Sequence, residues 1–134
     1  MICGLDISTS ITGVTLLDNS GKIVYNEAWD TRKFKDFFDK AEFIRRKITF
    51  LTEEYKIDEV YIEQSLQSFR SGFSSAKTLS SLSRFNGVIS WLMFSYTKKK
   101  PEYLSATSAR KSCGIKVPRG TKAKEVVVNF LLDN

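Results

Sequence analysis

Gly4-Leu5-Asp6-Ile7-Ser8-Thr9-Ser10 places a carboxylate after a short apolar run, and Val60-Tyr61-Ile62-Glu63-Gln64 places a second one in the same way. Short runs of this kind predict buried strands of a sheet. A carboxylate on such a strand costs free energy unless it is paired with a charge or bound to a metal ion. Asp6 and Glu63 are therefore candidate ligands of a shared cation.

The residues around Asp6 predict an antiparallel meander. A first strand ends near Asp6, and Thr12–Leu17 has the pattern of a second. Asp18-Asn19-Ser20-Gly21 is a strong turn signal, and the strand pattern resumes from Lys22 to Trp29. Asp6 is then expected on a central strand.

The remainder of the chain alternates helices and strands. Apolar residues recur at helical spacing in three segments, and two other segments are too short for helices and suit strands that join the sheet in parallel. The expected elements are a helix over Phe34–Tyr55, a strand over Ile57–Glu63, a helix over Ala76–Tyr96, a strand over Pro101–Leu104, a short helix after Ser105 and a last helix over Thr121–Leu132.

This order is the layout of the ribonuclease H-like fold, an α/β fold with a five-stranded mixed sheet, three antiparallel then parallel strands, flanked by helices. The motifs at Asp6 and Glu63, Gly87-Val88 in the long helix, and Lys122 in the last basic stretch resemble RuvC-type Holliday junction resolvases. The most specific part is the pairing of a Gly-x-Asp strand with an Ile-Glu-Gln strand. The resemblance implies one nuclease domain over residues 1–134.

The implied activity is structure-selective cleavage of four-way DNA junctions by two-metal phosphodiester hydrolysis. Two divalent ions about 3.5–4 Å apart activate a water and stabilise the leaving oxygen. Mg²⁺, with Mn²⁺ as an alternative, prefers oxygen ligands. The resemblance makes Asp6 and Glu63 metal ligands and Lys122 a catalytic residue that neutralises the scissile phosphate.

The family completes its site with acidic residues at the start of a later helix. The sequence ends at Asn134, and Asp133 falls too early to match them. We therefore expect a C-terminally truncated chain that lacks its last helix and final acidic ligands. Residues 1–134 alone would then be a poor nuclease.

The charge pattern indicates a nucleic-acid partner. The formal net charge is +6, and basic residues crowd the stretch from Lys98 to Lys124, where Glu102 is the only acid. A loop after Glu63 adds aromatic faces that suit unpaired bases. The candidate DNA contacts are Arg110, Lys111, Lys116, Arg119, Lys122 and Lys124 in the basic tract and Phe69, Arg70 and Phe73 in the loop.

Each of these signals has an ordinary structural alternative. Asp6 could cap a turn, Glu63 could be a salt-bridge partner, Phe69 and Phe73 could be packing residues, and a basic tract is often a solvated face. The segment Gly4–Gly13 also resembles the phosphate-binding opening of actin-like sugar and acetate kinases. A third interpretation is a junction-binding protein whose nuclease site has decayed.

The remaining expectations concern assembly and compartment. A homodimer would present two sites to the two equivalent strands of a junction. The surface around Leu82, Phe85, Ile89 and Met93 could either cover the sheet or pair with a second copy. Cys3 and Cys113 give no disulfide framework, which favours a reducing cytoplasm in a bacterium or a phage-infected cell. No apolar run approaches membrane-spanning length.

Overall fold

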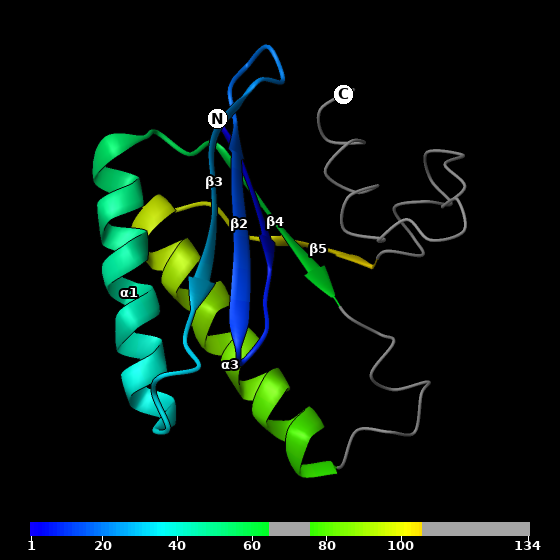
Figure 1. The fold of residues 1–134 in the computed structure, drawn as a ribbon. Helices are drawn as coiled ribbons and strands as arrows, with labels where there is room; N and C mark the ends of the chain where they lie inside the picture. The colour runs from blue at the N-terminus through cyan, green and yellow to red at the C-terminus, as the bar shows by residue number, and fades with distance from the viewer. Residues whose placement is uncertain (65–75, 106–134) are drawn as a thin grey trace, which may run out of the picture.

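A computed structural model of the protein describes residues 1–64 and 76–105 (Figure 1). The strands and helices predicted within these residues are present, with ends shifted by a few residues. The expected helices after Ser105 and over Thr121–Leu132 lie outside the described residues. The observed elements are β1 (Ile2–Asp6), β2 (Ile11–Leu17), β3 (Ile23–Asp30), α1 (Phe37–Glu54), β4 (Glu59–Gln64), α3 (Ala76–Thr97) and β5 (Glu102–Ser105).

The strands form one five-stranded sheet in the order β3-β2-β1-β4-β5. The pairs β1–β2 and β2–β3 are antiparallel, whereas β4 pairs in parallel with both β1 and β5. This topology confirms the predicted α/β fold with a mixed sheet. It also confirms that β1, which ends at Asp6, is the central strand.

Helix α1 begins three residues later than the apolar spacing predicts, at Phe37. The reason is a capping interaction, because the Asp36 carboxylate accepts a hydrogen bond of 3.1 Å from the Asp39 N–H. Phe34 belongs to the preceding turn, in which its N–H donates to the Thr31 carbonyl. An N-cap aspartate therefore overrides the apolar period at this end of the helix.

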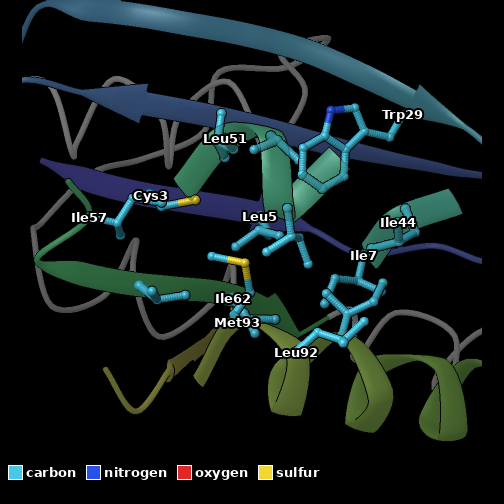
Figure 2. Packing of buried hydrophobic residues seen from close by; sticks show 14 of the residues in the cluster. Cys3, Leu5, Ile7, Trp29, Ile44, Leu51, Ile57, Ile62, Leu92 and Met93 are labelled. Atoms are coloured by element: carbon cyan, nitrogen blue, oxygen red, sulfur yellow. The ribbon is translucent and has the colours of Figure 1, made fainter. Parts of the chain in front are cut away.

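The hydrophobic core lies between one face of the sheet and the two helices α1 and α3 (Figure 2). Along β1 and β4 the side chains alternate, so that Leu5 and Ile62 point into this core. The residues packed there include Cys3, Leu5, Val14, Leu16, Trp29, Val60 and Ile62 from strands, Ile44, Ile48 and Leu51 from α1, and Phe85, Ile89, Leu92 and Met93 from α3.

The burial of α3 decides between the two interpretations of its apolar residues. Leu82 is partly buried, whereas Phe85, Ile89 and Met93 are fully buried against the sheet and α1. The three fully buried residues therefore cannot form a docking surface for a second copy without unfolding the core. The exposed side of α3 carries other large apolar side chains, Trp91 and Phe94.

Cys3 is a buried core residue with a free thiol. Burial raises the pKa of this thiol to about 12, so it stays neutral and is a poor nucleophile or metal ligand. Cys113 lies outside the described residues. Among the helices that the structure describes, none is long and apolar enough to cross a membrane.

Candidate functional site

Asp6 and Glu63 lie directly opposite each other on the two central parallel strands. Asp6 is the last residue of β1, and its Cα partner on β4 is Glu63. Neighbouring strands are about 4.7–4.9 Å apart, and partners in register direct their side chains to the same face. Leu5 and Ile62, one residue earlier, point into the core, so the two carboxylates project from the opposite face. Both are half-buried.

The two neighbours of this carboxylate pair in the sheet differ in size. Gly13 on β2 is the Cα partner of Asp6, and Leu104 on β5 is the partner of Glu63. A Cβ added at Gly13 would lie 3.8 Å from the Asp6 Cβ, which is ordinary van der Waals contact. Glycine therefore leaves open, on the β2 side, the space that a side chain would fill next to Asp6.

This geometry gives a prediction for Gly13. Gly13→Ala should bind Mn²⁺ like the wild type, because the added methyl group fits at 3.8 Å. Gly13→Leu should weaken Mn²⁺ binding by about tenfold, because its longer side chain crowds the Asp6 carboxylate. Electron paramagnetic resonance of Mn²⁺ measures both affinities. Equal affinities for the two variants at equal thermal stability would mean that the Asp6 carboxylate does not bind the ion.

The turn that follows Asp6 is held by side chains from three other parts of the fold. Thr12 Oγ1 donates to the Ser8 carbonyl (3.2 Å), and Thr31 Oγ1 lies 2.9 Å from the Thr9 carbonyl. Lys40 Nζ, from the first turns of α1, donates to the same Thr9 carbonyl at 2.6 Å. Thr12 and Thr31 are fully buried. Sequence reasoning missed all three side chains, since a threonine or lysine at these positions carries no distinguishing pattern.

The donor set fits a hard divalent cation only in part. Asp6 and Glu63 supply the carboxylate oxygens that Mg²⁺ prefers, and Mg²⁺ commonly keeps several waters beside one or two carboxylates. Within residues 1–64 and 76–105, however, no group of three or more His, Cys, Asp or Glu residues could hold a metal ion. The described part of the site can therefore anchor a hydrated ion and does not enclose one.

The other predicted site residues fall outside the described residues, and their roles stay predictions. Phe69, Arg70 and Phe73 belong to the segment 65–75. The segment 106–134 contains Arg110, Lys111, Lys116, Arg119, Lys122 and Lys124. The structure thus brings Asp6 and Glu63 together and leaves the predicted DNA contacts untested.

Comparisons with known proteins find matches among solved structures. No family model matches the sequence, and no curated protein matches it either. RuvC from T. thermophilus in complex with a Holliday junction substrate has a TM-score of 0.68 and 10% identity, over 98% of this chain and 90% of that chain. A second Thermus thermophilus RuvC structure has a TM-score of 0.62 and 11% identity, over 98% and 91% of the two chains. At this identity the likeness shows the fold, which is that of the ribonuclease H-like RuvC structures.

Proposed function

We propose that this chain acts as a structure-selective DNA endonuclease that resolves four-way junctions by metal-dependent phosphodiester hydrolysis. The observation that carries the proposal is the register of Asp6 with Glu63 on the central parallel strands. Two carboxylates side by side on neighbouring strands supply the oxygen ligands that Mg²⁺ prefers. The likeness in fold to RuvC, one structure of which holds a Holliday junction substrate, supports the choice of reaction and substrate.

Each part of the chain has its own role in this proposal. Asp6 and Glu63 would hold Mg²⁺, or Mn²⁺, and fix its place relative to the scissile phosphate. When bound, two such ions per complete site would make a water nucleophilic near neutral pH and offset charge on the leaving oxygen. Lys122 would neutralise the phosphate, and the basic tract would bind the arms of branched DNA.

A homodimer is part of the proposal, since a four-way junction offers two equivalent strands. The exposed side of α3 is the proposed surface for the second copy. Trp91 is 63% exposed, and a Cβ built at Gly87, one turn earlier, meets no atom within 4 Å outside its chain neighbours and the backbone of its own helix. An adjoining groove of about 440 Å³, which Phe94 also lines, carries both signs of charge. Its charged residues are Lys98, Lys99, Lys100, Asp58, Glu59 and Glu102. A surface with both signs can pair with itself across a two-fold axis.

Trp91→Glu is therefore expected to convert the dimer into a monomer, because it places a charge in an apolar contact. Sedimentation velocity over a range of protein concentrations measures the change. Phe38→Glu is the matched control, since it places the same charge at an exposed aromatic residue of α1 instead of α3. A wild-type chain that is monomeric throughout, or a Trp91→Glu variant that still dimerises, would contradict this surface.

The proposed activity is tested with a labelled four-way junction and a linear duplex of matched sequence, each with Mg²⁺ and with EDTA. Symmetric, metal-dependent nicking of the junction alone is the expected result. Any longer form of the chain that the gene encodes belongs in the same assay, because further acidic ligands would raise the rate. Tight junction binding without cutting by any form would instead favour a junction-binding protein, and the absence of any junction preference would reject both.

A further inference from the structure

The turn between Asp6 and Ile11 determines how firmly the end of β1 is held. Asp6 is the last residue of its strand, and β2 begins at Ile11. Strand ends open more readily than strand centres, because fewer hydrogen bonds must break. A fixed turn directly after such a position helps to hold its carboxylate in one place.

Thr31 makes three hydrogen bonds to this turn, one from its backbone N–H and two from its hydroxyl. Its N–H donates to the Ser10 carbonyl at 2.8 Å. Its hydroxyl hydrogen is shared between the Thr9 carbonyl at 2.9 Å and the Ser10 carbonyl at 3.0 Å. Thr31 directly follows β3, which is an edge strand of the sheet. These contacts therefore join the end of this edge strand to the turn after Asp6.

We infer that Thr31 is a positioning residue, whose buried hydroxyl fixes the turn after Asp6 and thereby holds the Asp6 carboxylate in register with Glu63 for metal binding. This inference rests on the proposed function for the identity of the metal site. It assigns Thr31 no contact with DNA or metal. Outer-shell groups of this kind commonly change metal affinity by about 10–100-fold when they are removed.

The surrounding hydrogen bonds allow the Thr31 hydroxyl to be removed without a large loss of stability. In Thr31→Val, which keeps the shape of the side chain, the Thr9 carbonyl still accepts from Lys40 Nζ. The Ser10 carbonyl still accepts from the backbone N–H of residue 31. No buried carbonyl loses its last donor, so the thermal midpoint should fall by no more than about 5 °C.

The experiment compares wild type, Thr31→Val and Thr31→Ser, with Thr52→Val as the matched control. Thr52 also shares its hydroxyl between two backbone carbonyls, those of Ile48 and Thr49, but it lies near the end of α1. Two quantities are measured without DNA: Mn²⁺ affinity by electron paramagnetic resonance, and hydrogen exchange of the amides from Ser8 to Ile11. A third is the Mg²⁺ concentration that gives half-maximal junction nicking.

Thr31→Val is expected to lower Mn²⁺ affinity about tenfold and to raise the half-maximal Mg²⁺ concentration by the same factor. Exchange of the turn amides should be about tenfold faster, since the tether that opposes opening is gone. Junction affinity in EDTA should not change. Thr31→Ser should recover the wild-type values to within about twofold, and Thr52→Val should match wild type, because only the hydroxyl beside the turn matters.

A double variant sharpens the test. Lys40→Met alone leaves the Thr9 carbonyl bonded to Thr31, whereas Lys40→Met with Thr31→Val removes both of its side-chain donors. The two changes should therefore lower Mn²⁺ affinity by more than the product of their separate effects. A purely multiplicative result would mean that the two donors do not act on one turn.

Other outcomes separate this inference from the proposed function. Wild-type nicking and Mn²⁺ binding that Thr31→Val leaves unchanged would overturn the role of Thr31 and leave the nuclease intact. Losses that Thr31→Ser fails to recover, or that follow the thermal midpoint in every variant, would mean that Thr31 is merely structural. A wild-type chain that binds no Mn²⁺ would overturn both proposals.

Discussion

Asp6→Asn or Glu63→Gln is expected to lower the single-turnover cleavage of a four-way junction by at least about a thousandfold, while the junction is still bound. Each substitution keeps the size of the side chain and removes the charge that would hold a cation at the paired positions. Binding should be unchanged or tighter, because a negative charge near the DNA phosphates is lost. Quenched-flow cleavage and a binding titration in Ca²⁺ or EDTA measure the two effects separately.

Glu54→Gln is the control for this prediction. Glu54 is the exposed last residue of α1 and lies outside both the carboxylate pair and the groove proposed for the second copy. Its charge is removed in the same way, so a general effect of net charge would appear in this variant too. If Glu54→Gln loses as much activity as Glu63→Gln, the loss reflects net charge, and if the site variants lose binding along with cleavage, the two carboxylates are structural.

The positions of the strands, and the placement of the two carboxylates at strand ends, could be predicted from the sequence. Each strand carries its own signal, such as the apolar run before Asp6 and the branched and aromatic residues before Glu63. Their juxtaposition follows once β4 is taken as parallel to β1, since both carboxylates then fall at the same edge of the sheet. The register of Asp6 with Glu63 bears that step out.

The contacts that support the site could not be predicted in the same way. Thr31 and Lys40 reach the turn after Asp6 across separations of more than twenty residues, from the end of β3 and from α1. Such contacts depend on how the helix packs on the sheet, and no local pattern encodes them. The apolar spacing also places the start of α1 too early, because one capping hydrogen bond at Asp36 outweighs a continuing apolar period.

The outward face of α3 shows a further limit of periodicity. The helix carries apolar residues over much of its circumference, so spacing alone does not say which of them face the sheet. Phe85 and Trp91 belong to the same helix, yet Phe85 is fully buried and Trp91 is 63% exposed. Only the packing of α3 on the sheet and on α1 separates the residues that stabilise the fold from those that could contact a partner.

Phe85→Ala is accordingly expected to lower the free energy of unfolding by about 3–5 kcal/mol. Phe85 lies in the core between α3 and the sheet, and its ring meets Phe37 of α1 edge to face, with centroids 5.7 Å apart. Deleting the ring removes apolar burial and this aromatic contact and leaves a cavity that the close-packed surroundings fill only in part. Urea denaturation followed by circular dichroism measures the change.

Phe50→Ala provides the comparison, because Phe50 is an aromatic residue of α1 that is 56% exposed. Its loss should cost less than about 1 kcal/mol, as surface substitutions usually do. Domains are commonly stable by only about 5–15 kcal/mol, so Phe85→Ala should unfold measurably at temperatures where Phe50→Ala does not. Cleavage by Phe85→Ala should fall with the folded fraction and recover on cooling, whereas Asp6→Asn should stay folded and inactive at every temperature. A fully stable Phe85→Ala variant would mean that α3 does not pack on the sheet through this side chain.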